Sequence, residues 1–367
     1  KAPADPGRYT GVWRMKTADR FFGTNLSVVI QAGEVAASPP LAPAPISGGS
    51  FELGGHVVGL GYADKMHYAG MTWVKVQAHY EADLSGFIAQ AHAAGFKVLV
   101  GALGSRDSVT QSGFEQNFAN WIARLSVAGA DAVEIWNEPN IDREWAWERL
   151  SPEAYTSLLQ HCYIAVKNGP NPGTLVISAA MAPTGCWGAA GCGCSDFCGG
   201  CGCNDDVFLA GMAAAGAANY IDCVGTHHNA GATSPSATTG HSAGSHYSWY
   251  FWPTINLYYN TFGGARQVVV TEFGYATPEG TCPSGLPENF AWGNNTTVAQ
   301  QAAWLAEGAS LAASSGKVRL MIVWNVDFFA RNDCAPGYGD PQRSFAIIRP
   351  DGSCPACDPI VLLPGTR

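Results

Sequence analysis

The sequence predicts an α/β protein, specifically a (β/α)8 TIM barrel, and two observations support this fold class. First, apolar, β-branched runs of strand length recur along the chain, at 55–60, 71–78, 96–102, 131–137, 174–180, 221–227, 266–272 and 318–325. Second, helical patterns separate most of these runs. Eight strands that alternate with helices are typical of a TIM barrel, because parallel strands need a long crossover between them.

The predicted helices carry recognisable start and stop signals. They are expected at 84–94, 114–128, 152–167, 207–217 and 298–315. Ser151 followed by Pro152 is a typical helix start, with serine as the N-cap and proline at the first helical position. Gly95 and Gly316 follow two helix ends, where a left-handed residue is favoured. An open doubly wound sheet is the alternative, but no Gly-x-Gly-x-x-Gly follows the first strand, which disfavours a dinucleotide fold.

Residues 1–50 differ in composition from the rest of the chain. Residues 26–31 read as a short strand, and 36–49 form a connector rich in alanine, proline, serine and glycine. The sequence therefore predicts an N-terminal arm with its connector over 1–50 and a (β/α)8 barrel domain over 51–367. We expect the arm to pack on the barrel.

Composition narrows the class of partner. Of 367 residues, 47% are hydrophobic and only 13% are charged, and this charged share is about half the usual one. The net charge of −9 disfavours nucleic acid or an anionic membrane as partner. No apolar run is long enough to span a bilayer. A weakly charged, aromatic-rich surface suits a neutral polysaccharide or oligosaccharide, and we expect a monomer.

The chain has 12 cysteines, which predicts disulfides and a secreted, extracellular protein, because reducing compartments rarely keep such bonds. Six of them lie between 186 and 203, in an insert after the fifth strand that has too few apolar residues to fold without crosslinks. Six cysteines allow fifteen pairings. The alternative is a zinc or iron–sulfur site, since Cys-x-x-Cys occurs at 198–201, but no second pair has finger spacing.

The other six cysteines are spread along the chain. Cys282 and Cys334 fall in the loops after the seventh and eighth strands, which are neighbours in a barrel. We predict a bond between them. Cys354 and Cys357 are expected to close a small C-terminal loop.

Two strings place a glutamate at the end of a strand, at 133–140 and 268–275. Glu138 follows the fourth predicted strand, and Glu272 ends the seventh. The active site of a TIM barrel lies at this end of the strands. Hydrolysis of a glycosidic bond needs one protonated and one ionised carboxyl group, and two close carboxylates push their pKa values apart. The alternative is that each glutamate belongs to a structural ion pair.

The residues around these glutamates resemble a known group. Trp136-Asn137-Glu138-Pro139-Asn140 resembles the acid/base motif of clan A of the glycoside hydrolases. Thr271-Glu272-Phe273-Gly274-Tyr275 resembles the nucleophile motif of the same clan, and order and spacing are similar to families 39 and 5. The resemblance covers about 51–350. It implies that Glu138 is the general acid and then the general base, that Glu272 forms the covalent intermediate, and that no cofactor is needed.

The same resemblance implies further site residues. Asn137 would bind the sugar 2-hydroxyl, Trp324 would be the aromatic platform, and His227 matches a histidine common in the clan. A tyrosine usually follows two residues later, but this chain has Asn229. Either Tyr247 or Tyr250 supplies the hydroxyl, or the subsite differs.

Strand alternation and the loops supply the remaining candidates. Alternation puts Lys75 and Gln77 on one face of the second strand, where Lys75 either takes the place of an arginine near the nucleophile or pairs with Glu134 inside the barrel. Trp187 would face sugar from a rigid insert. The aromatic stretch 246–252 is either a sugar-binding wall or helix packing. The expected substrate-binding residues are thus Asn137, His227, Trp324, Lys75, Gln77, Tyr275, Asn229, Trp187 and Tyr250.

Together these features predict a secreted retaining β-glycoside hydrolase that acts by double displacement on a poly- or oligosaccharide. The alternatives are a transglycosidase with the same two glutamates and a non-catalytic carbohydrate-binding protein. A metal or redox protein built on the Cys-rich insert is a further alternative.

Overall fold

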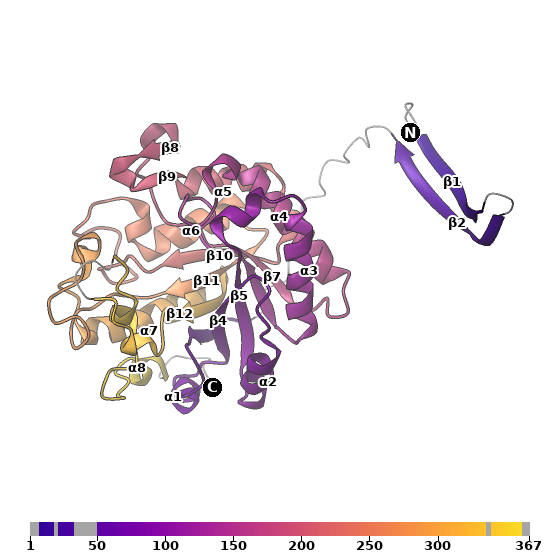
Figure 1. The fold of residues 1–367 in the computed structure, drawn as a ribbon. Helices are drawn as coiled ribbons and strands as arrows, with labels where there is room; N and C mark the ends of the chain where they lie inside the picture. The colour runs from indigo at the N-terminus through magenta and orange to yellow at the C-terminus, as the bar shows by residue number, and fades with distance from the viewer. Residues whose placement is uncertain (1–6, 18–20, 33–49, 335–338, 362–367) are drawn as a thin grey trace. The chain divides into compact units, whose positions relative to one another are not determined.

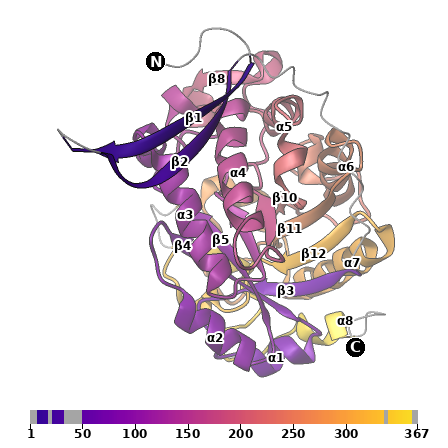
Figure 2. The same cartoon turned by 90° about the vertical axis from the view of Figure 1, so that its right-hand side faces the viewer.

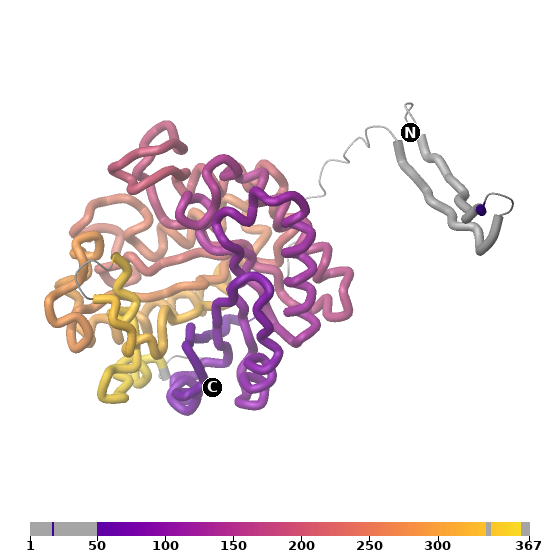
Figure 3. The backbone as a smooth tube through the Cα atoms, viewed as in Figure 1, coloured from indigo at the N-terminus to yellow at the C-terminus, as the bar shows by residue number. Residues whose placement is uncertain are grey.

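A computed structural model describes residues 7–17, 21–32, 50–334 and 339–361, and the chain divides into two compact units, 1–44 and 45–367. Figure 3 traces the backbone. The described part of the first unit is a hairpin of β1 (Gly7–Lys16) and β2 (Phe21–Ala32), which pair antiparallel. The strand expected at 26–31 is therefore confirmed, but it extends over Phe21–Ala32 and pairs with β1, which the sequence did not predict. That the arm packs on the barrel stays a prediction.

The second unit is a closed barrel of eight parallel strands, so the predicted TIM barrel is confirmed (Figure 1). Their order around the barrel is β10, β11, β12, β3, β4, β5, β6, β7. The strands are β3 (Glu52–His56), β4 (Trp73–His79), β5 (Lys97–Leu103), β6 (Ala132–Ile135), β7 (Leu175–Ser178), β10 (Cys223–His228), β11 (Gln267–Phe273) and β12 (Val318–Val323).

The first barrel strand was misplaced, since the sequence predicted 55–60 and the strand is 52–56. Gly54 and Gly55 lie inside the observed strand. A Cβ atom at Gly54 would stand 2.6 Å from Cβ of Trp73. The absent side chain thus lets β3 and β4 approach closely.

Helices surround the barrel (Figure 2). They are α1 (Ala63–Tyr68), α2 (Ser85–Ala93), α3 (Phe114–Val127), α4 (Pro152–Lys167), α5 (Asp205–Ala214), α6 (Phe251–Thr261), α7 (Val298–Ser315) and α8 (Cys357–Val361). The predicted cap of α4 is present, since Ser151 Oγ accepts a hydrogen bond from the Ala154 N–H at 3.1 Å. Gly316 ends α7 with a φ of 68°, as its position predicted.

The apolar core has two parts that position the site. Side chains such as Trp73, Leu99 and Val269 fill the barrel interior, and a larger cluster lies between strands and helices. Above the interior cluster, toward the C-terminal ends of the strands, the filling becomes charged, with Lys75 and Glu134 fully buried. The interior of the barrel is therefore apolar toward the N-terminal ends of the strands and polar toward their C-terminal ends, where the predicted site lies.

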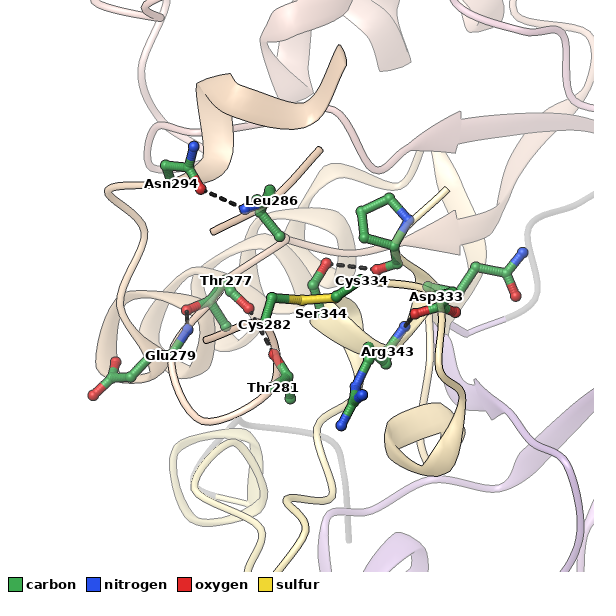
Figure 4. Close-up of a disulfide and its surroundings, with 12 residues drawn as sticks. Thr277, Glu279, Thr281, Cys282, Leu286, Asn294, Asp333, Cys334, Arg343 and Ser344 are labelled. Carbon is green, nitrogen blue, oxygen red and sulfur yellow. Dashed lines mark hydrogen bonds between the residues drawn. A yellow bond between two sulfur atoms is a disulfide. The ribbon is translucent and has the colours of Figure 1, made fainter. Parts of the chain in front are cut away.

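Five disulfides are present among the described residues. Cys282–Cys334 joins the loops after β11 and β12 (Figure 4), and Cys354–Cys357 closes a short loop, so both predicted bonds are confirmed. The six cysteines of the insert also pair as disulfides: Cys186–Cys198, Cys192–Cys203 and Cys194–Cys201. Within the described parts of the chain, no helix is both long and apolar enough to cross a bilayer.

Candidate active site

A β-bulge aims Glu272 into the barrel mouth. In the pairing of β11 with β10, Val270 lies opposite Thr226 but Glu272 lies opposite His227, so Thr271 is an extra residue. Val269 faces the barrel interior, and strict alternation would therefore have turned Glu272 outward. A bulge shifts the alternation by one residue, as bulges near active sites often do. Glu272 is 6% exposed at the C-terminal end of its strand.

Glu138 reaches the same mouth from a loop. It stands three residues beyond the end of β6, with a φ of 45°, and its backbone N–H donates to the Ala180 carbonyl at 3.0 Å. Trp136 has a φ of 75°. Left-handed backbone is uncommon for residues other than glycine and persists where the surroundings enforce it. The loop after β6 is therefore held in a specific, locally unfavourable shape.

His227 lies between the two carboxylates. Its Nδ1 is 3.1 Å from Oε1 of Glu138 and 3.8 Å from Oε2 of Glu272, and the side chain is 1% exposed. Its Nε2 is buried and has no hydrogen-bond partner among the described residues. The structure thus brings Glu138, Glu272 and His227 into one cluster.

Asn229 binds Glu272 directly. Its Nδ2 donates a hydrogen bond of 2.9 Å to Oε2 of Glu272. The two tyrosines that were candidates for this role lie elsewhere: Tyr247 donates to Asp205, and Tyr250 donates to the carbonyl of Gly244. An amide group therefore contacts this carboxylate where a tyrosine hydroxyl was expected.

The motif resemblance implies that Glu272 is the reacting carboxylate, and on that basis replacing Asn229 by alanine is expected to lower kcat/KM about 100-fold, since removal of one oriented donor at a reacting charge typically costs this much. Asn229→Asp should cost more, because a like charge raises the pKa of Glu272 and keeps it protonated. Steady-state kinetics across pH would show this. Exposed Asn117 on α3 offers the matched control Asn117→Ala, and equal kinetics for Asn229→Ala and this control would refute the contact's importance.

Lys75 takes the internal ion pair that was one of its two predicted roles. Its Nζ is 2.7 Å from Oε2 of Glu134 and also donates to the Thr271 carbonyl at 3.2 Å. Lys75 is therefore tied to the backbone next to Glu272 without contacting that carboxylate. Gln77, two residues further on the same face, is exposed, so it lies nearer the mouth.

The pKa values of Glu138, Glu272 and His227 are shifted by burial and by neighbouring charges. Burial raises the pKa of Glu138, but the hydrogen bond and charge of His227, with the charge of Arg143, outweigh burial and hold that pKa below its ordinary value. Burial raises the pKa of Glu272, and the charges of His227 and Lys75 only partly oppose it. Burial lowers the pKa of His227, but Glu272 and Glu138 outweigh it, so this pKa is raised. The cluster therefore favours a proton on His227.

Arg143 is a site residue that the sequence did not reveal. Its Nη2 lies 2.8 Å from Oε2 of Glu138, and its side chain is 70% exposed. It also contacts Glu144 at 3.3 Å. No motif or alternation marks an arginine five residues after the glutamate. The contact follows from how the loop after β6 folds back.

The roles of Asn137 and Trp324 toward a bound sugar stay predictions, but the structure shows what surrounds each side chain. Oδ1 of Asn137 is buried beside Glu138 without a hydrogen-bond partner in the described structure, so it is free to accept from a bound hydroxyl. Trp324 follows β12, and its backbone N–H donates to the Phe273 carbonyl at 2.8 Å. Its ring packs edge-on against His56, with centroids 4.8 Å apart. Both residues lie at the C-terminal end of the strands.

The structure does not bring Tyr275, Tyr250 or Trp187 to the carboxylates. The side chains of Tyr275 and Tyr250 are buried, which contradicts their predicted contact with substrate, whereas the contact of the half-buried Trp187 with sugar stays a prediction. Tyr275 is fully buried and packs on Phe273 and Trp304, because after the bulge odd-numbered residues point toward the helices. Tyr250 is 3% exposed and bonds its own loop. The ring of Trp187 packs on Gly202 within the insert.

Comparison with solved structures finds the same barrel in glycoside hydrolases. An exo-beta-1,4-mannosidase from Opitutaceae bacterium strain TAV5 is 10% identical over 85% of this chain, with a TM-score of 0.53, and the match spans 58% of that protein. The endoglucanase Cel5A of Thermotoga maritima is 10% identical (84% of this chain, 96% of that chain, TM-score 0.47). A curdlan-specific exo-beta-1,3-glucanase from Blastomyces gilchristii is 15% identical (80% and 98%, TM-score 0.45).

At such low identity the likeness to the mannosidase establishes the fold alone. Neither protein-family models nor curated protein sequences match this chain. The case for function therefore rests on the site.

Proposed function

We propose that the protein is a retaining β-glycoside hydrolase of poly- or oligosaccharides, with Glu138 as general acid/base and Glu272 as nucleophile. The observation that carries this proposal is the pair of largely buried carboxylates on either side of His227 at the C-terminal end of the barrel. The two sequence motifs around these glutamates support the same roles. The five disulfides support secretion, because such bonds persist in oxidising compartments.

The spacing of the carboxylates favours retention of configuration. Because both contact one imidazole nitrogen, at 3.1 and 3.8 Å, their nearest oxygens cannot be farther apart than the sum of these distances. The two catalytic carboxyl groups are about 6.5–9.5 Å apart in inverting enzymes and about 5–5.5 Å apart in retaining enzymes. The limit set by His227 lies near the lower end of the inverting range. The limit excludes most of the inverting range and admits the retaining one, which supports direct attack by Glu272.

The proton for the leaving group is held by Glu138 together with His227. At rest His227 donates from Nδ1 to Oε1 of Glu138, so the two side chains share one proton. Movement of that proton to Oε1 makes Glu138 the acid that protonates the glycosidic oxygen. Glu272 meanwhile attacks the anomeric carbon and displaces the leaving group. Glu138, again ionised, then deprotonates the water that hydrolyses the intermediate.

The pKa directions predict a bell-shaped dependence of kcat/KM on pH. Activity should rise as pH passes the raised pKa of Glu272, which must be ionised to attack. It should fall as pH passes the raised pKa of His227, where the shared proton is lost. In His227→Gln the loss of the imidazolium raises the pKa of Glu272 further, so the lower limb should move to higher pH. The leaving-group proton is then held by the carboxyl of Glu138 alone, which titrates at lower pH than the imidazolium, so the upper limb should move to lower pH and the profile should narrow from both sides. An unchanged profile would contradict the shared proton, and His92→Gln on α2 is the matched control.

A glycan screen with product sizing tests the proposal as a whole. Purified protein is incubated with β-linked glucans, mannans, xylans and galactans, and NMR follows the anomer that forms first. Retained configuration is the expected result. Inverted products would reject the double displacement, and sugar transfer without net hydrolysis would identify a transglycosidase. Binding without turnover would identify a non-catalytic carbohydrate-binding protein.

A further inference from the structure

The Cys-rich insert (residues 186–203) is a small crosslinked hairpin. Its strands β8 (Cys192–Ser195) and β9 (Gly200–Cys203) are antiparallel, and Cys192 and Cys194 lie directly opposite their disulfide partners Cys203 and Cys201. The third disulfide, Cys186–Cys198, links the segment that leads into β8 to the turn between β8 and β9. With few apolar side chains, this hairpin depends on its crosslinks for order.

The hairpin binds the loop that carries Glu138, here called the acid loop (residues 137–143). The N–H of Cys203 donates to the Asn140 carbonyl at 2.8 Å, and the N–H of Asp142 donates to the Cys201 carbonyl at 2.9 Å. Ile141 and Gly202 form an antiparallel bridge between these bonds. The acid loop thus adds a short third strand to the edge of β9.

Side chains reinforce this pairing. Oδ2 of Asp142 accepts from the N–H of Cys201 at 3.0 Å, and Nδ2 of Asn140 donates to the Cys203 carbonyl at 3.0 Å. Asn140 is fully buried and also accepts from the Ala182 N–H at 2.8 Å. The acid loop is therefore bonded to the insert on one side and to the segment after β7 on the other.

Glycines allow the close approach. A Cβ atom at Gly202 would lie 2.7 Å from the Asn140 carbonyl oxygen, and one at Gly200, whose φ is 149°, would lie 2.6 Å from Oδ1 of Asp142. A side chain at Gly202 would push the two backbones apart, and one at Gly200 would displace the carboxylate of Asp142 that accepts from Cys201. The glycines between the cysteines therefore serve the contact with the acid loop.

We propose that the disulfide-bonded insert is a positioning element that holds the acid loop, and through it fixes Glu138 and Arg143 relative to Glu272. Glu138 stands two residues before the paired segment 140–142, and Arg143 follows it at once. Both ends of the Glu138–Arg143 contact are thus anchored by the insert. The catalytic consequence of this proposal rests on the proposed glycosidase function, whereas the anchoring of the acid loop by the insert does not depend on it.

Without the crosslinks, the hairpin would no longer present an ordered edge. The left-handed backbone of Trp136 and Glu138 would then lose part of the structure that maintains it. Glu138 would sample positions away from the glycosidic oxygen, and misplacement of a catalytic group by about 1 Å can cost about 100-fold in rate. Glu272, held by β11 and Asn229, would stay in place.

The test compares Cys194→Ser/Cys201→Ser with the matched control Cys354→Ser/Cys357→Ser, which removes the disulfide beside α8, at the opposite end of the barrel from β8 and β9 in both views (Figures 1 and 2). Hydrogen exchange followed by mass spectrometry should show faster exchange over 138–143 in the first variant and not in the second. Unchanged exchange there would overturn the proposal. Should the first variant fail to fold, Asp142→Ala, which removes one acceptor, is measured in its place with the same expectation.

Leaving-group dependence shows whether anchoring serves acid catalysis. For an unactivated oligosaccharide that the parent cleaves, kcat/KM should fall about 100-fold in Cys194→Ser/Cys201→Ser. For the 2,4-dinitrophenyl β-glycoside of the same sugar it should fall less than about threefold, since that leaving group departs without a proton. Equal losses on both would reject a role in positioning Glu138. A parent without activity on any glycan refutes the proposed function, and hydrogen exchange then decides the anchoring alone.

Discussion

Replacing Glu272 by glutamine is expected to lower kcat on every glycan that the protein cleaves by at least about 10⁴-fold, the scale found when a catalytic nucleophile is removed. The amide cannot form the covalent bond to the anomeric carbon. Its geometry is otherwise similar, so its amide oxygen can still accept from Asn229 and the fold should persist. Steady-state kinetics with circular dichroism would separate loss of chemistry from loss of structure.

The matched control for this variant is Glu288→Gln, which neutralises an exposed glutamate beyond the same strand. It should keep the kinetics of the parent. A 2-deoxy-2-fluoro aryl glycoside should label the parent protein, and peptide mass mapping should place the label on Glu272. Near-normal turnover by Glu272→Gln, or a label on Glu138, would overturn the assigned roles.

The barrel could be predicted because it rests on short-range patterns. Most barrel strands are apolar, β-branched runs, and the misplaced β3, which contains Gly54 and Gly55, is the exception. The caps at Ser151 and Gly316 depend only on adjacent residues. Alternation along β4 correctly put Trp73 and Lys75 on one inner face. The same rule fails in β11, because the bulge at Thr271 inserts one extra residue. Glu272 was instead indicated by its place at the end of the strand and by the motif resemblance, neither of which depends on alternation.

The parts of the site that could not be predicted depend on contacts between distant segments. The N–H of Cys201 reaches Asp142, 59 residues earlier, and nothing local in either segment indicates that pairing. The Asn229–Glu272 hydrogen bond was likewise hidden, because asparagine was judged as a missing tyrosine. Polar side chains that satisfy one another across loops leave no periodic signal, whereas burial of apolar faces does.

Replacing Lys75 by methionine is expected to lower the free energy of unfolding by about 3–5 kcal/mol, because it leaves the carboxylate of Glu134 buried and unpaired. Both partners are almost completely shielded from water at a separation of 2.7 Å. The variant also removes the donor to the Thr271 carbonyl at the bulge. Urea unfolding of parent and variant measures the loss. Lys97→Met, which breaks the half-exposed contact with Glu52, is the matched control and should cost less than about 1 kcal/mol.

The double variant Lys75→Met/Glu134→Gln separates stability from electrostatics. With the second charge gone, no buried carboxylate is left unpaired, and stability should return to within about 1–2 kcal/mol of the parent. The amide oxygen introduced by Glu134→Gln can still accept from the Ala180 N–H that Glu134 binds. The pKa of Glu272 should nevertheless rise, because Lys75 lowers it more than Glu134 raises it. The acid limb of kcat/KM should therefore move to higher pH in a stable protein. If the double variant remains as unstable as Lys75→Met, the packing of the Lys75 side chain matters more than its charge. If the acid limb of kcat/KM does not move, the buried ion pair does not tune the pKa of the nucleophile.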